Sequence, residues 1–194
     1  MPKIILLDNF DSFTYNLVDI FRIKNYKVYI YRNNIKKEKI IKKILNLKKP
    51  ILILSPGPGI PKNSGCMMSL IKLLKGKIPI IGICLGHQAI IESYGGKINK
   101  CTKIIHGKSS FINHDQKDMF YKLPNPISVG RYHSLVFKKK EIPNELKINA
   151  YKKNLVMAVK NNYNRICGFQ FHPESILTPH GEKILENTLQ WTYL

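Results

Sequence analysis

The chain has 194 residues, with 32 Lys and Arg against 12 Asp and Glu, which gives a formal net charge of +20 and a pI near 9.8. This length fits one domain over residues 1–194, and 44% hydrophobic residues exclude a disordered chain. No apolar run approaches the ~20 residues of a membrane helix, and Asp8 interrupts the N-terminal apolar run too early for a signal peptide. We therefore expect a cytoplasmic protein without membrane contact.

The excess of positive charge raises the alternative of a basic nucleic-acid-binding module. Only four of the 32 basic residues are Arg, the side chain best suited to bidentate recognition of bases and phosphates. Lys, Ile and Asn are abundant throughout the chain, on expected surfaces, cores and loops alike. This pattern favours compositional drift over a polyanion-binding site, and we expect no nucleic-acid partner.

The first half alternates short apolar runs with helical patterns. The apolar runs are typical of strands buried on both faces of a parallel sheet. Strands are predicted at 3–7, 27–31, 50–54 and 78–83, and helices at 12–24, 36–47 and 64–74. Asp11, Ser12 and Asn63 are candidate N-caps for these helices.

The pattern changes after a further helical stretch that ends near Tyr94. Shorter strands with turn signals follow, and asparagines at 161, 162 and 164 favour a hairpin. Strands are predicted at 97–100, 127–130, 146–151, 155–160 and 166–171, with a last helix at 179–191. The expected fold is α/β: an open, mixed, mainly parallel sheet flanked by helices, with an additional antiparallel section.

The strongest chemical signal is Gly82-Ile83-Cys84-Leu85-Gly86, between a buried strand and a helix. This is a nucleophile-elbow pattern with Cys in place of Ser, and it presents the thiol at the carboxyl edge of the sheet. The alternative is a small buried Cys between two packing glycines. The other cysteines (Cys66, Cys101, Cys167) form no C-x-x-C pair, so no metal site is expected and all four are predicted to be free thiols.

A thiolate nucleophile needs a proton carrier, and the carrier needs an orienting acceptor. His172-Pro173-Glu174 follows a predicted strand, and alternate residues of an extended segment face the same way, so His172 and Glu174 can pair. Alone, this tripeptide is typical of a loop, but the upstream elbow favours a Cys–His–Glu triad. His87 is the rival base, although its place at a helix start makes a supporting role the better interpretation.

A third motif, Ser55 to Pro61 (SPGPGIP), directly follows a predicted strand. It lacks the Gly-Lys-Ser/Thr ending of a nucleotide-binding loop. Its glycines expose backbone N–H groups beside the elbow, which suits an oxyanion hole. The alternative is a stiff turn at the end of the strand.

These motifs closely resemble the class I (triad) glutamine amidotransferases, and within that family the subunits that serve anthranilate synthase. The resemblance spans essentially the whole chain. It is carried by LLDNFDSFTYNL from Leu6, SPGPGIP from Ser55, GICLGHQAI from Gly82, HGKSS from His106, RYHSL from Arg131 and GFQFHPESILT from Gly168. The resemblance implies a flavodoxin-like fold and hydrolysis of L-glutamine. The released ammonia would pass to a separate synthase subunit that aminates chorismate.

The resemblance also implies a role for each matched residue. Cys84 would form a γ-glutamyl thioester, His172 would carry the proton, and Glu174 would orient His172. The residues expected to hold the oxyanion and the glutamine are Gly57, Pro58, Gly59, Leu85, Gln88, Ser134 and Leu135. The segments 8–16 and 106–108 also match the family, either as partner contacts or as turns and helix caps.

The resemblance further implies a heteromeric complex with anthranilate synthase component I, the chorismate-binding subunit. No cofactor is expected in this chain, and Mg²⁺ is expected on the partner. Gly59-Ile60 and Gly65-Cys66-Met67 favour the anthranilate pathway over the para-aminobenzoate (aminodeoxychorismate) synthase of folate biosynthesis, or a subunit shared by both. A stand-alone cysteine hydrolase with the same elbow remains the alternative from the residues alone.

Overall fold

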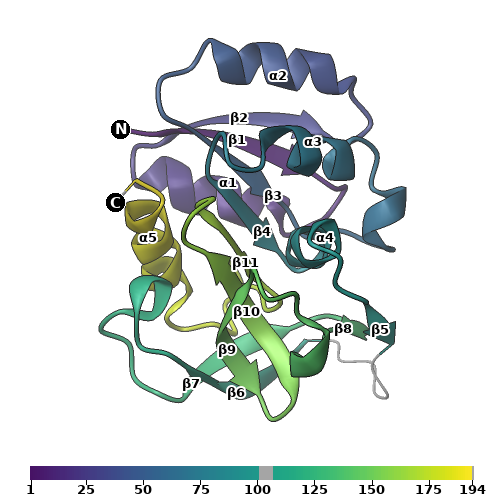
Figure 1. Cartoon of the computed structure of the whole chain (residues 1–194). Helices are drawn as coiled ribbons and strands as arrows, with labels where there is room; N and C mark the ends of the chain where they lie inside the picture. Colours follow the sequence, from purple (N-terminus) through teal and green to yellow (C-terminus); the bar gives the residue numbers. More distant parts are fainter. Residues whose placement is uncertain (101–106, 194) are drawn as a thin grey trace.

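The computed structural model describes residues 1–100 and 107–193, whose centre is a nine-stranded sheet (Figure 1). The strand order is β2-β1-β3-β4-β11-β10-β9-β6-β7. The strands are β1 (Lys3–Asp8), β2 (Lys27–Arg32), β3 (Pro50–Leu54), β4 (Ile80–Ile83), β6 (Lys108–His114), β7 (Ile127–Arg131), β9 (Lys147–Lys152), β10 (Leu155–Asn161) and β11 (Ile166–Phe169). The first five in this order run parallel and the rest antiparallel, which confirms the predicted mixed sheet.

Five helices in the described chain cover the two faces of the parallel part. They are α1 (Thr14–Ile23), α2 (Lys37–Leu45), α3 (Met67–Leu74), α4 (Leu85–Ser93) and α5 (Gly181–Trp191). Ile4 and Leu6 of β1 pack with α1 and α5, whereas Ile5 and Leu7 pack with α2, α3 and α4. Because successive strand residues point to opposite faces, the unbroken apolar run of β1 supplies both cores.

The antiparallel part contains one strand that the sequence did not indicate. β10 and β11 form the hairpin expected at the asparagines, with Asn161 paired to Ile166. Strand β6, however, pairs with β7 and β9, and of its side chains only Ile112 and His114 are buried. With so few apolar residues, β6 is defined by its neighbours rather than by its own pattern. A separate two-stranded sheet joins β5 (Asn99–Lys100) and β8 (Leu135–Val136).

The helix starts differ from the predicted ones by one to three residues. Asp11 and Ser12 do not cap α1, because Asp11 accepts the N–H of Phe13 in a turn that precedes the helix. Asn63 ends a short 3-10 helix (Pro61–Asn63), and α3 begins only at Met67. At its C-terminal end the chain forms a turn at 178–181 before α5 begins at Gly181.

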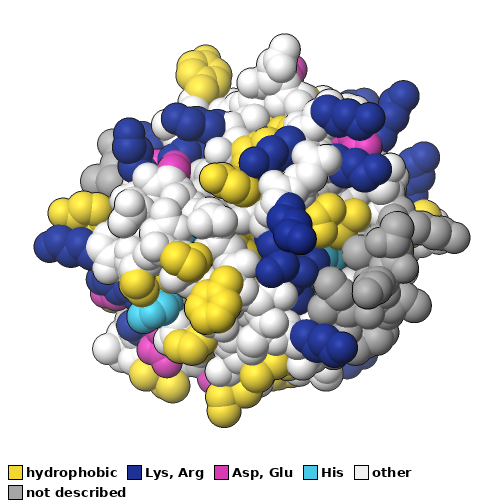
Figure 2. All heavy atoms as spheres, turned by 90° about the horizontal axis from the view of Figure 1, so that it is seen from below, with side chains coloured by type: hydrophobic (Ala, Val, Ile, Leu, Met, Phe, Trp, Pro, Cys, Tyr) yellow, Lys and Arg dark blue, Asp and Glu magenta, His cyan; other side chains and the backbone are white. Residues whose placement is uncertain are grey.

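Most basic side chains lie on the surface around the fold, whereas Arg131 and Lys160 are buried. Figure 2 shows Lys and Arg spread over one face, with apolar and uncharged side chains between them. The segments 51–61, 78–96 and 166–182, which include β4, β11 and the loops after them, contain no Lys or Arg. Within the described residues no helix has both the length and the apolar character needed to cross a membrane.

Candidate active site

Cys84 lies in a strained turn between β4 and α4. Its φ is +49° and its ψ is −97°, a conformation that non-glycine residues rarely adopt. A Cβ on Gly82 would lie 2.4 Å from the carbonyl carbon of Gly86, and one on Gly86 would lie 2.4 Å from the carbonyl oxygen of Leu54. Only glycine allows strand and helix to approach so closely, so the local sequence forces the thiol outward at the carboxyl end of β4.

His172 and Glu174 lie just beyond the end of the adjacent strand β11. The His172 N–H donates to the carbonyl of Gly130 at 3.0 Å, which anchors the segment to β7. The Nδ1 atom of His172 lies 2.7 Å from Oε1 of Glu174, and both side chains are buried. Nε2 of His172 is also buried, and within the described part of the chain it has no hydrogen-bond partner. Cys84 lies close enough to this ring to act on it electrostatically.

The charge state of His172 follows from these neighbours. Burial lowers the pKa of His172, but electrostatic and hydrogen-bond interactions with Cys84 and Glu174 outweigh the effect of burial and raise this pKa to about 10. The site therefore holds a protonated imidazole between Cys84 and Glu174. That arrangement can supply a nucleophile and a proton to the same substrate.

Two aromatic rings enclose the His172 imidazole. The ring centroids of Phe13 and Tyr132 lie 5.3 and 4.9 Å from that of His172, both in edge-on contact. The Tyr132 hydroxyl lies 3.0 Å from Oγ of Ser175. Phe13, from the motif near the N-terminus, thus shields the triad from the side of α1.

A small cleft of about 140 Å³ opens at the Cys84 thiol. Its lining consists of Gly57, Pro58, Gly59, Cys84, Gln88, Tyr132, His133, Ser134 and Leu135. Three segments far apart in the sequence therefore meet here, and they include all the predicted glutamine-contacting residues except Leu85. Leu85 occupies the first turn of α4, and its side chain packs beside Gly57.

The proline-rich loop is held in place by Asn9. The N–H of Asn9 donates to Oγ of Ser55 at 2.8 Å, and its Nδ2 donates to the carbonyl of Ser55 at 2.9 Å. A Cβ on Gly57 would lie 2.5 Å from Cβ of Asn9, so the two segments are in close contact. This contact gives part of the segment 8–16 a structural role beside the cleft.

His87 does not line the cleft. Its side chain is fully buried on α4, where it packs against Gly168 and edge-on against Phe137. Burial lowers the pKa of His87 to about 3, so the ring is neutral. These surroundings are those of a packing residue rather than of a base facing a substrate.

The buried histidines predict a stability maximum near pH 6.5. Burial lowers the pKa of both His87 and His133 to about 3 and also lowers that of His114, so below pH 6.5 the unfolded chain binds more protons than the folded chain, two of them at His87 and His133. As the pH decreases below 6.5, His87 and His133 together should lower the free energy of unfolding by up to about 2.7 kcal/mol per pH unit. The raised pKa of His172 acts in the opposite sense, and its contribution is lost as the pH rises from 6.5 towards 10.

Urea unfolding between pH 5 and 9 measures this dependence above the range in which carboxylates titrate. His87→Leu should reduce the slope on the acid side by up to about 1.4 kcal/mol per pH unit and leave the alkaline side unchanged. An acid-side slope that is the same in both proteins would contradict a neutral, buried His87.

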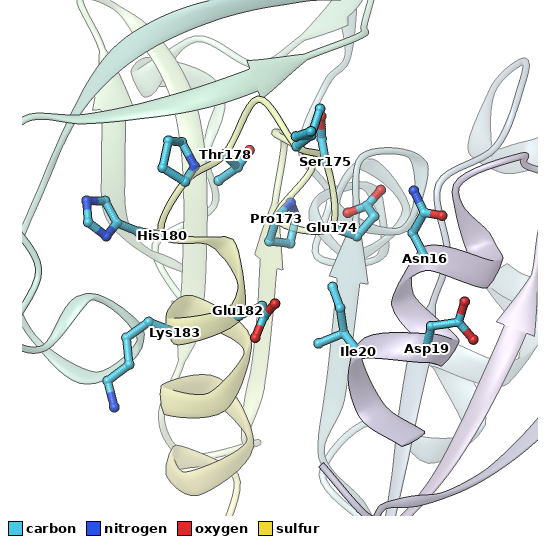
Figure 3. Close-up of a pocket in the computed structure, with 12 residues that line it drawn as sticks. Asn16, Asp19, Ile20, Pro173, Glu174, Ser175, Thr178, His180, Glu182 and Lys183 are labelled. Carbon is cyan, nitrogen blue, oxygen red and sulfur yellow. The ribbon is translucent and has the colours of Figure 1, made fainter. Parts of the chain in front are cut away.

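A larger groove of about 670 Å³ lies on the other side of the triad (Figure 3). Residues of α1 and of the segment 173–183 line it, including Asn16, Asp19, Glu174 and Glu182. Glu174 thus borders this groove and not the cleft at Cys84. Among the described residues no group of three His, Cys, Asp or Glu is placed to hold a metal ion.

Some residues of the site were not singled out from the sequence. Tyr132 and His133 line the cleft, and Gln170 lies behind it, with its Nε2 3.6 Å from Sγ of Cys84. Gln170 is two residues before His172, so the same alternation that pairs His172 with Glu174 also indicates it. His106, named in a matching motif, lies outside the described residues, as does Cys101.

Comparison with known proteins agrees with this geometry. The family model of the class-I glutamine amidotransferases matches residues 5–191. Anthranilate synthase component 2 of Buchnera aphidicola subsp. Schizaphis graminum is 56% identical to this chain, and the match covers all of this chain and 98% of that protein. Anthranilate synthase component 2 of Vibrio parahaemolyticus is 51% identical, over 98% of this chain and 96% of that protein.

The solved structure of a putative GMP synthase protein from Thermoplasma acidophilum has a TM-score of 0.85 at 24% identity, over 100% of this chain and 94% of that one. This likeness supports the flavodoxin-like fold. The chain belongs to the class-I glutamine amidotransferase family.

Proposed function

We propose that this protein is the glutamine amidotransferase subunit of anthranilate synthase. The observation that carries the proposal is the buried Cys84–His172–Glu174 arrangement at a small polar cleft, in a chain 56% identical to a protein named anthranilate synthase component 2. Its substrate is L-glutamine, and its product is ammonia for a chorismate-aminating subunit. The names of these relatives favour this pathway over para-aminobenzoate synthesis.

In the first half of the reaction, the Cys84 thiolate attacks the side-chain amide carbon of glutamine. A tetrahedral intermediate forms, and His172 gives its proton to the amide nitrogen. The C–N bond then breaks, ammonia leaves, and a γ-glutamyl thioester remains on Cys84. Glu174 keeps the imidazole oriented throughout, through the 2.7 Å contact with Nδ1.

In the second half, neutral His172 accepts a proton from water as the water attacks the thioester. Collapse of the second tetrahedral intermediate breaks the C–S bond and releases glutamate and the Cys84 thiolate. The reformed pair of thiolate and imidazolium is the state from which the cycle began.

The cleft supplies donors for the oxyanion and contacts for the substrate. The N–H groups in the first turn of α4, including that of Leu85, have no partner within the helix and lie at its positive end. Together with the backbone of Gly57, Pro58 and Gly59 they would bind the developing oxyanion. Gln88, Ser134 and Leu135 would contact the bound glutamine.

The partner in this proposal is anthranilate synthase component I, bound in a heteromeric complex in the cytoplasm. The chemistry of this chain uses no cofactor of its own, and Mg²⁺ belongs to the partner's reaction with chorismate. Nucleic acid and membranes are not partners, and the charge of +20 has at most a steering effect on an acidic partner.

Reconstitution with the synthase subunit tests this function. Alone, the protein should hydrolyse glutamine slowly, and the synthase subunit with chorismate should raise that rate and yield anthranilate. Full glutaminase activity without any partner would indicate the stand-alone hydrolase. Formation of aminodeoxychorismate by a cognate synthase instead of anthranilate would indicate the folate pathway.

A further inference from the structure

Gln170 is a buried polar residue directly behind the nucleophile. It follows β11, and its backbone N–H donates to the carbonyl of Met157 at 2.8 Å. Its neighbours Phe169 and Phe171 point into the apolar core, so Gln170 and His172 point to the opposite side, towards Cys84. No part of Gln170 is exposed to solvent.

The Gln170 amide contacts two residues of the site at once. Its Nε2 lies 3.6 Å from Sγ of Cys84, and its Oε1 accepts a hydrogen bond from Nε2 of Gln88 at 3.3 Å. Gln88 in turn lies at the cleft, where the same Nε2 is 3.5 Å from the carbonyl oxygen of Leu135. A continuous polar chain therefore connects the cleft with the nucleophilic sulfur.

The direction of each hydrogen bond in this chain follows from the Leu135 carbonyl, which can only accept. Gln88 must turn its NH₂ group towards it, so the Gln170 atom that faces Gln88 is the oxygen. The nitrogen of Gln170 is then left facing Cys84, where its N–H points to the sulfur. Charge-assisted hydrogen bonds of this kind are the strong ones in a protein interior.

The other partners of the Leu135 carbonyl support the same assignment. Nε of Arg131 donates to Nε2 of His133 at 3.1 Å, so His133 carries its proton on Nδ1. That proton is directed at the Leu135 oxygen, 3.0 Å away. The carbonyl thus receives donors from both sides and holds the Gln88 amide in one orientation.

We infer that Gln170 is a further catalytic residue: its amide N–H stabilises the Cys84 thiolate, while its oxygen anchors Gln88 at the cleft. The N–H stabilises the sulfur in the two steps in which the sulfur carries a negative charge. The first is before attack on the amide, and the second is the breaking of the C–S bond of the thioester. The inference deepens the proposed function and rests on it for the identity of the substrate. The contact itself can be tested without glutamine.

Alkylation of Cys84 by iodoacetamide measures the reactivity of the thiolate directly. The S–C bond forms as iodide leaves, and the peptide that contains Cys84 can be followed by mass spectrometry separately from the other cysteines. Gln170→Met, which keeps the shape but removes the donor, should slow this alkylation about tenfold at pH 7. Gln170→Glu, which places an acceptor and a negative charge at the sulfur, should slow it further.

Steady-state kinetics with glutamine give a second readout. Gln170→Met should lower kcat about tenfold and change KM less, because the side chain touches the sulfur and not the cleft. Gln88→Met leaves Gln170 in place but removes its anchor, and should slow alkylation several-fold in the absence of glutamine. If Gln170→Met folds poorly, the alkylation rate of Gln88→Met still tests the inference.

Gln190→Met is the matched control, since Gln190 is exposed on α5 and its replacement should leave alkylation and kcat unchanged. Wild-type alkylation rates in a folded Gln170→Met protein, or in Gln88→Met if the former does not fold, would overturn the inference. Failure of the proposed function would instead show as a wild-type protein that does not hydrolyse glutamine even with its partner, whatever the alkylation rates.

Discussion

Cys84→Ser is expected to abolish glutamine-dependent anthranilate formation, by at least about 10³-fold, and to leave ammonium-dependent formation by the same complex unchanged. The hydroxyl of serine is far less acidic than a thiol, so the pair of nucleophile anion and imidazolium at His172 cannot form. Cys84→Ala should behave in the same way. Both substitutions preserve the turn, because neither the strained backbone at position 84 nor its flanking glycines are altered.

The measurement is anthranilate fluorescence in the reconstituted complex, with either glutamine or ammonium chloride as the nitrogen source. Cys167→Ser is the matched control, because Cys167 is a free buried thiol in the adjacent strand, away from the cleft. Loss of the ammonium reaction together with the glutamine reaction would show that Cys84 supports the complex structurally. Retention of glutamine-dependent activity would exclude Cys84 as the nucleophile.

His172→Ala is expected to lower glutamine turnover by about 10² to 10⁴-fold, the usual contribution of a general acid and base. Without the imidazolium, ammonia must leave unprotonated and the thiolate loses its counter-charge. Cys84 should therefore also react more slowly with iodoacetamide. The ammonium-dependent reaction of the partner should again be unaffected.

The Ala variant leaves the fully buried Glu174 carboxylate without its partner, so His172→Gln is a useful companion. Its amide N–H can still donate to Glu174 but cannot carry a proton, so activity should stay low while the melting temperature recovers. A His172→Gln protein with near wild-type turnover would contradict the assignment. A melting transition that collapses in both variants would mark His172 as structural.

The positions of the core strands and of the nucleophile could be predicted from the sequence because both depend on local features. Runs such as 50–54 are apolar on both faces, and only a doubly covered strand satisfies them. The glycines two residues before and after Cys84 indicate a tight strand-to-helix turn that presents the thiol. His172 and Glu174 share a face because an extended chain alternates. The segments without Lys or Arg meet at the site together with residues 132–135, which directly follow Arg131.

Other features were decided only by contacts between distant segments. Strand β6 has few buried side chains of its own and exists because β7 and β9 supply its hydrogen-bond partners. Such pairings carry no local periodicity, so a single sequence does not indicate them.

The site shows the same division between local and distant information. That Cys84 and His172 belong together could be predicted from motif order, but the contribution of Gln170 depends on Gln88 and Leu135, which lie 82 and 35 positions away along the chain. Only the folded chain brings the Leu135 carbonyl to the Gln88 amide and so orients the N–H at the sulfur. The sequence by itself determined which chemistry the chain can perform, and the tertiary structure decided how its atoms are held, because hydrogen-bond direction is set by partners in space.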